Sequence, residues 1–502
     1  MTISRRSFLY ALGAGTVVTV AGCTGEPSGA GPSSTGATTT TTTAPPSTSS
    51  APSGPPNWKA LRGKVSGGLL LPDDDGYHAA SRAFNPLFDN HKPAAIAKCK
   101  KPADVQACLD AVRGRGVPIA ARGGGHSYAG YSTPDDGLVL DLRGMATVDV
   151  KGDQVEVGAG ARLIDVYAGV AQAGRLLPAG SCPSVGIAGL TLGGGIGVLT
   201  RKYGLTCDRL VSARVVTPDG QLVTASADEH ADLYWALRGG GGGNFGVVTS
   251  FTFSTEDAPE LAVFSLRFPA GATADVLDAW QSWVKDAPHE LWSNCVVSGG
   301  STPTCRVGGC YVGSTSGLSS VLSGLTASVS PSSRSAIGKS YLDAMKYMGG
   351  CSSKSIDQCH PAAEGGSLNR ESFTASSRML GKAVPGAKIV SAMRGHSGMD
   401  LLLDSLGGAV SDVDPSETAF PHRNALASAQ IYMGGSAASA VGEVRGALGE
   451  LTGPNGYVNY IDPKMPDWGK AYYGDNLAKL KQVARTYDPD GVLSFAQSVA
   501  KA

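Results

Sequence analysis

The stretch ARGGGHSYAG, residues 121–130, places three consecutive glycines directly before His126. A short β-type run, residues 117–121, precedes them, so the glycines follow a predicted strand. Such loops let backbone N–H groups approach a ligand closely, because no Cβ intervenes. Residues 193–197 (GGGIG) and 239–246 (GGGGGNFG) have the same character. Three such loops favour a large ligand lying across several turns, such as a dinucleotide; three tight turns without a ligand are the alternative.

Two common phosphate motifs do not account for these loops. The chain contains no GxxxxGK[ST] stretch, which excludes a Walker A loop. A GxGxxG match is weak here, because the strand–helix–strand context that it requires does not fit. His126 also needs a reason: an isolated loop histidine is usually a surface residue, but a bulky ring is unexpected in a loop that should admit a ligand closely.

Composition excludes two classes of function. Lys plus Arg equals Asp plus Glu, 42 of each, so the formal charge is zero and nucleic-acid binding is not expected. The eight histidines show no zinc-type spacing, so no metal site is predicted. The 502 residues are enough for a large core split over two domains.

The N-terminus predicts export. Arg5 and Arg6 precede an apolar run, residues 8–20, that is too short to span a bilayer. The arginine pair resembles a Tat signal, and the ending at Cys23 resembles a lipoprotein cleavage site; an ordinary Sec signal with a chance arginine pair is the alternative. Residues 24–57 are rich in Ser, Thr, Pro and Gly and read as a disordered linker. We therefore expect a cell-envelope lipoprotein, anchored by lipid on Cys23, or a secreted protein.

Cysteine counting singles out one thiol. Of the ten cysteines, lipid on Cys23 leaves nine, and an exported chain favours disulfides. Two local pairs are plausible, Cys99 with Cys108 and Cys351 with Cys359. Four further cysteines could pair in ways that the sequence does not show: Cys207, Cys295, Cys305 and Cys310. Cys182 is left over, in a loop of small residues upstream of a glycine cluster. An unpaired exported thiol is a liability unless a bond consumes it.

The predicted strands and helices alternate to about residue 255. From residue 262 to about 435 the pattern changes to that of a sheet backed by helices. The sequence therefore predicts an α+β fold. Three stretches make the chain recognisable: RGGGHSYAG (122–130), GSCPSVGIAGLTLGGGIGVLTRKYGLTCDRL (180–210), and a tail that starts with YVNYIDP (457–463). They resemble the berberine bridge enzyme-like flavin oxidases, which have the vanillyl-alcohol oxidase (PCMH-type) FAD-binding fold.

The resemblance covers residues 84–498 and implies a division of the chain. It implies a two-part PCMH-type FAD-binding domain (84–258) and a substrate domain with an antiparallel sheet backed by helices (259–440). A C-terminal berberine-bridge-type segment (441–502) would return to the FAD domain.

The resemblance also implies a bicovalent FAD. His126 would bond to the 8α-methyl group and Cys182 to C6 of the isoalloxazine ring, which would leave eight cysteines for pairing. The other implied cofactor contacts are Arg122, Gly123, Gly124, Gly125 and Ser127 around the pyrophosphate; Val185, Gly186, Gly189, Thr191, Gly194, Gly195 and Gly197 around the ring and ribityl chain; Val247 and Val248 at the adenine end; and Asn459.

Family members often use a tyrosine of an Asn-Tyr pair as the catalytic base, which corresponds to Tyr460. A free tyrosine titrates near about 10, so Tyr460 would need help to act as a phenolate. The alternative is that Tyr460 is a buried core residue with a structural role. Tyr457 is the weaker candidate for the base, because we expect it on the opposite face of an extended segment. The strand LASAQIYMGG (426–435) lacks the lysine of plant members, and its Gln430 and Tyr432 are predicted substrate contacts. Arg394 and His396 could replace that lysine but read more as loop residues.

The implied reaction is oxidation of an alcohol or sugar hydroxyl carbon. A valine three residues after the flavin-linked cysteine, here Val185, leaves O2 access to the flavin in the family, so an oxidase releasing H2O2 is expected. Trp280, Trp283 and Trp292 could stack on a sugar, although the first two share a helical face typical of core. The alternatives are a dehydrogenase that uses a membrane quinone or protein acceptor, and a non-catalytic envelope protein that retains FAD and binds a partner.

Overall fold

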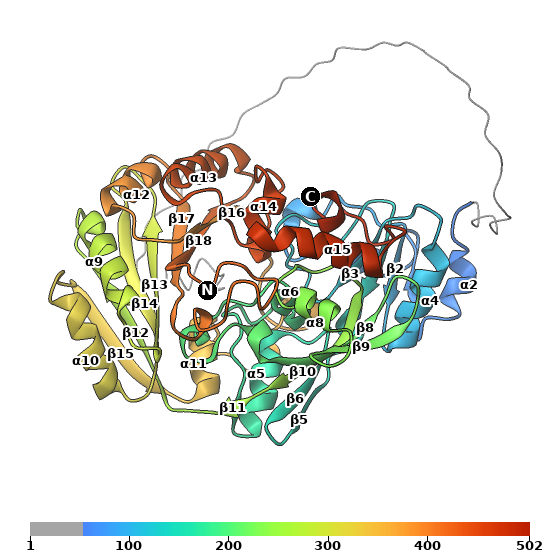
Figure 1. Ribbon diagram of the computed structural model, residues 1–502, viewed down its shortest axis with the longest axis horizontal. Coiled ribbons are helices and arrows are strands. Elements are labelled where there is room, and N and C mark those ends of the chain that lie inside the picture. Colours follow the sequence, from blue (N-terminus) through green and yellow to red (C-terminus); the bar gives the residue numbers. More distant parts are fainter. Residues whose placement is uncertain (1–53) are drawn as a thin grey trace, which may run out of the picture.

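The computed structural model describes residues 54–502. The predicted signal, the Cys23 lipid site and nearly all of the predicted linker lie outside the described residues. Figure 1 shows two bodies side by side: a blue-to-green body built from the first part of the chain and a yellow-to-orange body built from the middle part. Mixed helices and sheets form both bodies, so the predicted α+β class is confirmed. Within residues 54–502, no helix has the length and apolar character needed to cross a bilayer.

The first body contains a small mixed sheet and an antiparallel sheet. The mixed sheet has the order β1 (Leu69–Leu70), β2 (Ala95–Lys98), β4 (Leu138–Asp141), β3 (Ile119–Arg122), in which β4 runs parallel to β2 and β3. The antiparallel sheet has the order β5 (Val148–Lys151), β6 (Gln154–Gly158), β10 (Val247–Ser254), β8 (Leu210–Val216), β9 (Leu222–Ser226), and β7 (Arg175–Leu176) pairs with β11 (Glu256–Asp257) beside it. The helices of this body are α2 (Trp58–Arg62), α3 (Tyr77–Ser81), α4 (Pro102–Val112), α5 (Leu163–Gln172), α6 (Ile187–Leu192), α7 (Thr200–Tyr203) and α8 (Ala231–Leu237).

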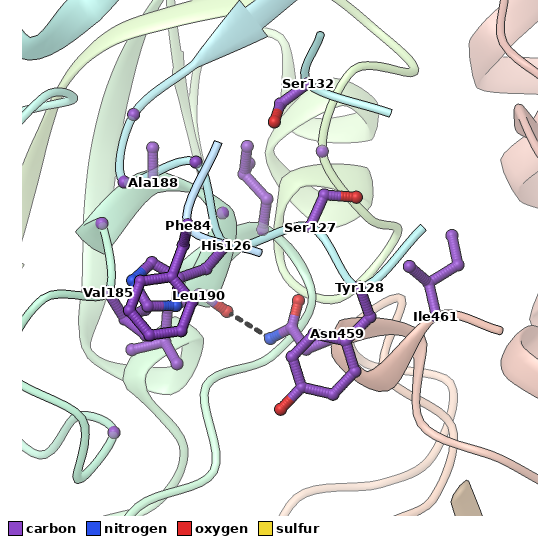
Figure 2. A pocket seen from close by; sticks show the side chains of 18 of the residues that line it. Phe84, His126, Ser127, Tyr128, Ser132, Val185, Ala188, Leu190, Asn459 and Ile461 are labelled. Atoms are coloured by element: carbon purple, nitrogen blue, oxygen red, sulfur yellow. Dashed lines mark hydrogen bonds between the residues drawn. The ribbon is translucent and has the colours of Figure 1, made fainter. Parts of the chain in front are cut away.

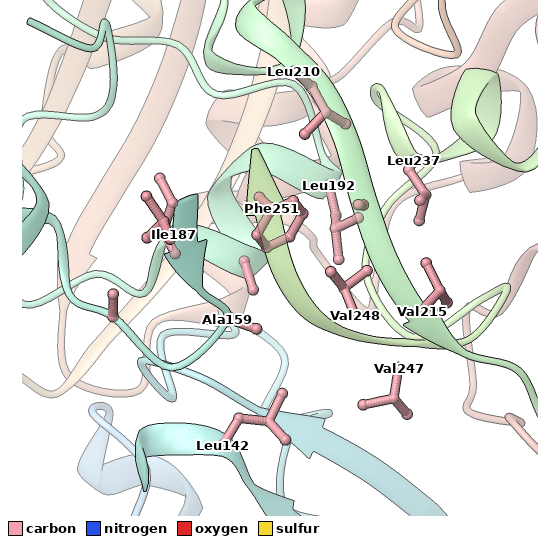
Figure 3. Packing of buried hydrophobic residues seen from close by; sticks show 14 of the residues in the cluster. Leu142, Ala159, Ile187, Leu192, Leu210, Val215, Leu237, Val247, Val248 and Phe251 are labelled. Carbon is pink, nitrogen blue, oxygen red and sulfur yellow. The ribbon is translucent and has the colours of Figure 1, made fainter. Parts of the chain in front are cut away.

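Helix α6 matters most for the site, because it joins the segment of Cys182 to the second glycine loop. It buries Ile187 completely, and its Leu192 is 7% exposed. Figure 3 shows Leu192 beside Phe251 and Val248 of β10, and Ile187 belongs to the same cluster. Burying a side chain of this size stabilises the fold by about 1.5–3 kcal/mol. The loops on either side of α6 are thereby held against the antiparallel sheet.

The second body is a seven-stranded antiparallel sheet with four of its five helices on one face; the fifth helix, Tyr341–Met348, lies on the opposite face and joins the first body's core. Its strand order is β15 (Ser333–Lys339), β12 (Leu261–Arg267), β14 (Thr304–Val312), β13 (Leu291–Ser298), β17 (Met399–Ser405), β18 (Ala427–Gly434), β16 (Phe373–Leu380). Its helices are α9 (Thr273–Lys285), α10 (Thr315–Thr326), α11 (Tyr341–Met348), α12 (Gly386–Met393) and α13 (Ala438–Thr452). Alternate strand residues such as Leu401, Leu403 and Ile431 pack with α9, α10, α12 and α13 in one core. The other alternate residues face the first body.

The last part of the chain returns to the first body, as the red helices of Figure 1 show. Helices α14 (Trp468–Tyr473) and α15 (Leu477–Tyr487) are amphipathic or apolar, and Leu480 and Val483 join the first body's core rather than the second. A chain end docked in this way ties the two bodies together through the connection at residues 453–467.

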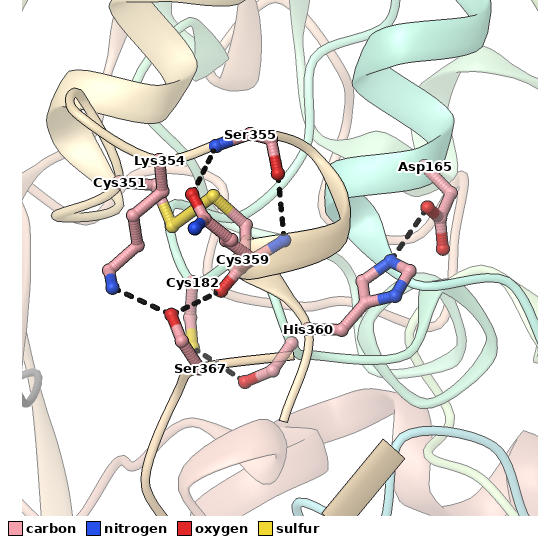
Figure 4. Close-up of a disulfide and its surroundings, with 10 residues drawn as sticks. Asp165, Cys182, Cys351, Lys354, Ser355, Cys359, His360 and Ser367 are labelled. Carbon is pink, nitrogen blue, oxygen red and sulfur yellow. Dashed lines mark hydrogen bonds and ion pairs between the residues drawn. A yellow bond between two sulfur atoms is a disulfide. The ribbon is translucent and has the colours of Figure 1, made fainter. Parts of the chain in front are cut away.

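A disulfide closes a loop that also links the bodies. Cys351 and Cys359 are bonded, which confirms that predicted pair. In the same loop His360 Nε2 lies 2.8 Å from Asp165 Oδ1 on α5 of the first body (Figure 4). The predicted pair Cys99 and Cys108 is not bonded. The free cysteines of the described residues are Cys99, Cys108, Cys182, Cys207, Cys295, Cys305 and Cys310.

A buried ion pair connects the bodies and yields a stability prediction. Arg423, fully buried before β18, donates to both carboxylate oxygens of Asp208 in the first body, each at 2.7 Å. Because Arg423→Met leaves a carboxylate without its cation, we expect the free energy of unfolding to fall by about 3–5 kcal/mol, measured by chemical denaturation followed by tryptophan fluorescence. Arg62→Met is the control, since its pair with Asp74 is exposed and worth about 0–1 kcal/mol. Equal losses in the two variants would contradict this assignment.

Candidate functional site

A long cavity lies between the two bodies. Its volume accessible to the centres of water molecules is about 390 Å³, far more than one or two buried waters need. Its walls are two of the predicted glycine loops (residues 123–125 and 241–246), the segment 180–189, the face of the large sheet that is turned toward the first body, and a turn at residues 457–461. The cavity therefore brings together segments from every part of the described chain.

Two glycine backbones meet at the centre of this wall. A Cβ added to Gly124 would lie 2.2 Å from the backbone nitrogen of Gly186, and one added to Gly186 would lie 2.3 Å from that of Gly124. Arg162 spans the contact: its guanidinium donates to the carbonyl oxygens of Gly124 (3.3 Å) and of Ser184. Glu364, from the second body, pairs with the same guanidinium. Only glycine permits this approach, and the loops of His126 and Cys182 are consequently adjacent.

His126 is held on both its face and its edge. Its ring stacks on Phe84, with centroids 3.9 Å apart and planes 19° apart. Its Nε2 lies 3.1 Å from the Ser184 hydroxyl oxygen. Figure 2 shows Phe84, His126 and Val185 gathered at one end of the cavity, with Tyr128, Asn459 and Ile461 toward the other.

Cys182 approaches the same hydroxyl. Its Sγ lies 3.6 Å from Ser184 Oγ, so the two predicted flavin attachment residues both contact one serine. The end of α11, just before the disulfide-closed loop, supports this segment: a Cβ on Gly349 would lie 2.8 Å from the carbonyl oxygen of Ser181. Figure 4 shows Cys182 next to the Cys351–Cys359 bond. Neither Ser184 nor Phe84 was singled out by sequence reasoning.

Most of the predicted cofactor residues line the cavity. Those that do are Gly123, Gly124, Gly125, His126, Ser127, Cys182, Val185, Gly186, Gly189, Gly197, Val247, Val248 and Asn459. Asn459 also donates through Nδ2 to the carbonyl oxygen of Leu190 at 2.9 Å, the dashed line of Figure 2. This bond ties the 457–461 turn to α6.

Arg122 also lines the cavity, and its side chain joins parts of the fold. The guanidinium is 2% exposed and bonds Asp141 at 3.3 Å, the carbonyl oxygens of Ala80 and Ser81, and Thr133. Those partners lie in the fold rather than in the cavity. The guanidinium thus joins β3 and β4 to the end of α3, and the pyrophosphate contact of residue 122 stays a prediction.

Three other predicted contacts lie outside the cavity lining. Gly194 and Gly195 have φ values of 118° and 90°, which L side chains rarely adopt. A Cβ would meet Phe420 at the first and Thr206 at the second, so both serve close packing. Thr191 is fully buried in α6. Their contact with a cofactor stays a prediction.

The tyrosine pair lies in a turn and not, as expected, in an extended segment. Residues Val458–Tyr460 form a 3-10 turn, which brings the rings of Tyr457 and Tyr460 to 5.0 Å at 80° instead of onto opposite faces. Tyr457 is buried, and its hydroxyl accepts bonds from the Gly195 amide (2.9 Å) and Asn459 Nδ2 (2.8 Å). Burial raises the pKa of Tyr457 to about 12. Tyr460 is half-buried and lines the cavity.

Aromatic rings and an amide form the wall opposite. The ring of Tyr460 stacks on that of Tyr128 at 5.5 Å and 10°, and the Tyr128 hydroxyl accepts from Gln430 Nε2 at 2.6 Å. Tyr432 stacks on Phe373 at 4.7 Å and donates to Glu371 at 3.0 Å. The predicted substrate contacts Gln430 and Tyr432 thus both face the cavity.

The large sheet adds residues that the sequence reasoning missed. Asn294 on β13 and Asp404 on β17 are register partners, and both line the cavity with Trp292. Alternation along β13 and β17 is the signal that could have found them, since their neighbours Leu291, Leu403 and Ser405 point the other way. Trp292 is 5% exposed, and its indole N–H has no partner among the described residues.

The remaining predicted candidates lie elsewhere. Trp280 is fully buried under α9 and bonds Ser293 at 3.0 Å, and Trp283 bonds the carbonyl oxygen of Val321, so both are core residues. Arg394 and His396 lie in the connection after α12, outside the cavity lining. No group of three or more His, Cys, Asp or Glu side chains suited to a metal occurs in the part of the chain that the structure describes.

Comparison with known proteins places two family descriptions on the chain. "FAD binding domain" matches residues 93–226, and "Berberine and berberine like" matches residues 456–500. The first covers the glycine loop of His126 and the segment of Cys182. The second covers the tyrosine turn and the C-terminal helices.

Related chains match nearly end to end. An uncharacterized FAD-linked oxidoreductase of Bacillus subtilis, YgaK, is 32% identical over 449 residues, which cover 87% of this chain and 97% of that relative. The structure of Physcomitrella patens BBE-like 1 superimposes with a TM-score of 0.82 at 30% identity, covering 88% of this chain and 99% of that one. Glucooligosaccharide oxidase from Acremonium strictum, described with a 6-S-cysteinyl, 8α-N1-histidyl FAD, gives a TM-score of 0.79 at 26% identity, covering 88% and 98%.

The glycine contact makes a direct prediction. Gly124→Ala puts a methyl group against backbone, which cannot move aside as a flexible side chain could, so we expect the free energy of unfolding to fall by about 1–3 kcal/mol in a denaturation experiment. Gly446→Ala is the matched control: it lies exposed on α13 with nothing within 4 Å of its Cβ and should stabilise by about 0.5–1 kcal/mol. A Gly124→Ala protein as stable as wild type would show that the loops are not in contact.

Proposed function

Because the chain belongs to the berberine bridge enzyme-like family of FAD-linked oxidoreductases, we propose that it is a bicovalent-flavin oxidase of alcohols or carbohydrates. It would remove hydride from a hydroxyl-bearing carbon and reduce O2 to H2O2. The observation that carries the proposal is the convergence of His126 and Cys182 on the hydroxyl of Ser184.

The cavity suits an FAD. Its wall of small residues, in which Gly189 has nothing within 4 Å of a Cβ and Gly242 has only Leu192 at 3.7 Å, leaves backbone open to a flat or extended group. Two nucleophilic side chains, an imidazole and a thiol, lie where the benzenoid edge of a flavin would be held from two sides. A bicovalent link needs both nucleophiles within one ring's width, and a shared hydroxyl contact meets that requirement.

Bound FAD supplies the two-electron redox chemistry, and the protein supplies binding, orientation and proton removal. We assign the proton transfer to Tyr460. Its neighbour Tyr457 is a poor base, because burial raises its pKa to about 12 and its hydroxyl is occupied by hydrogen bonds from the backbone and Asn459. Tyr460 is half-buried and lines the cavity, so its ring is open to a bound substrate.

The wall formed by Tyr128, Gln430 and Tyr432 would position the substrate. Aromatic faces suit the C–H surface of a sugar ring, and the amide and phenol groups suit its hydroxyls. A carbohydrate is favoured over a simple alcohol by the glucooligosaccharide oxidase similarity and by the number of polar groups in the wall.

O2 is the proposed electron acceptor, since Val185 lines the cavity beside Cys182 and is the residue that the family resemblance associates with O2 access. A dehydrogenase that uses a quinone or protein acceptor and a non-catalytic FAD-containing binding protein remain the competing functions. Export by Tat, and a lipid anchor on Cys23 or secretion, complete the proposal; these features fall on residues outside those the structure describes.

The flavin linkage is tested by acid precipitation of the purified protein. We expect a yellow pellet from the wild type and, for His126→Ala and Cys182→Ala, one remaining bond each, read as the mass of flavin on the other peptide. The double variant should release all its flavin to the supernatant. A colourless wild-type pellet would refute the bicovalent proposal.

The catalytic assignment is tested with Tyr460→Phe. Removal of a positioned base slows the chemical step by about 10²–10⁴-fold, so kcat for H2O2 release from sugars and alcohols in air should fall by that factor while covalent flavin is retained. Tyr311→Phe, outside the cavity lining, should leave kcat unchanged. A Tyr460→Phe enzyme with wild-type kcat would remove this tyrosine from the mechanism, and turnover only with an added dye or quinone would favour the dehydrogenase.

A further inference from the structure

Ser184 occupies a position that neither the family match nor the sequence motifs assign. It is 1% exposed, and its hydroxyl oxygen lies 3.1 Å from His126 Nε2 and 3.6 Å from Cys182 Sγ. A buried hydroxyl must satisfy its hydrogen bonds within the protein, because no water is available to replace them. The hydroxyl is therefore committed to the two nucleophiles.

The chemistry of a hydroxyl fixes the direction of these contacts. It has one proton to donate and lone pairs to accept with. If Nε2–H donates to Oγ and Oγ–H donates to the Cys182 sulfur, one chain of hydrogen bonds orders both the imidazole and the thiol. In this tautomer of His126 the Nδ1 atom carries the lone pair, and Nδ1 is the ring nitrogen called N1 in the histidyl-FAD link of the glucooligosaccharide oxidase.

The surroundings keep Ser184 and the ring in place. Arg162 bonds the Ser184 carbonyl and the Gly124 carbonyl together, which fixes the serine backbone relative to the His126 loop. Phe84 stacks on the imidazole at 3.9 Å, which opposes rotation of the ring about its Cβ–Cγ bond. The hydrogen bond between Nε2 and Ser184 holds the edge of the ring in the same place.

We infer that Ser184 is the positioning residue for covalent flavin attachment: its hydroxyl selects the nucleophilic nitrogen of His126 and orients the sulfur of Cys182. The inference rests on the proposed bicovalent FAD. In each attachment a flavin C–H bond and one N–H or S–H bond break and a C–N or C–S bond forms. The two protons and two electrons released pass to O2, giving H2O2. The histidine proton leaves from Nε2, the atom that faces Ser184.

The test compares three variants of the full chain with wild type. Ser184→Ala and Ser184→Val remove the hydroxyl, whereas Ser184→Thr keeps it, and Val and Thr have nearly the same shape. Ser132→Ala is the matched control, because Ser132 lines the same cavity and its buried hydroxyl has no partner among the described residues. Each protein is incubated with FAD in air, and mass spectrometry follows the fraction carrying no, one or two flavin bonds over time; the thermal midpoint monitors folding.

We expect both bonds to form at least about tenfold more slowly in Ser184→Ala and Ser184→Val, in line with loss of a partner that orients a histidine. Ser184→Thr and Ser132→Ala should stay within about twofold of wild type. Formation of both bonds at the wild-type rate in either hydroxyl-free variant would overturn the inference. If Ser184→Ala does not fold, the Val and Thr pair decides it. A wild type without covalent flavin would instead refute the proposed function.

Discussion

The contact between the backbones of Gly124 and Gly186 is the constraint on which the site depends. Neither position has room for a Cβ, and Arg162 bonds the carbonyls on both sides of the contact. Two loops separated by about sixty residues therefore present His126 and Cys182 to the same hydroxyl. Glu364 joins the arrangement from the second body through Arg162, so the site and the packing of the two bodies are coupled.

The second constraint is the alternation of side chains along the large sheet. The helices α9, α10, α12 and α13 cover one face of the sheet. The opposite face places Asn294, Asp404, Gln430 and Tyr432 in the lining of the cavity. The glycine loops can hold a flat cofactor, and the sheet can face it with polar and aromatic groups. This division separates cofactor binding from substrate choice, because each lies on its own rigid element.

The sequence was informative where a local pattern has one physical meaning. Consecutive glycines before His126 and a lone thiol in a small-residue loop pointed to the two residues that we propose as flavin attachment sites, and both lie against Ser184. It could not show which group the Arg122 guanidinium binds, because its partner Asp141 is set by the pairing of β3 with β4. It missed Phe84 and Ser184 because their role exists only when distant loops meet. The 457–461 turn was read as extended because its conformation depends on the bonds that Tyr457 and Asn459 make to α6 and the loop after it.

The central claim is that one flavin joins two distant loops of this chain. Proteolysis of the wild-type protein followed by mass spectrometry tests it most directly. The account predicts a single yellow species in which the peptide containing His126 and the peptide containing Cys182 are joined through one FAD. Recovery of both peptides at their unmodified masses would contradict it.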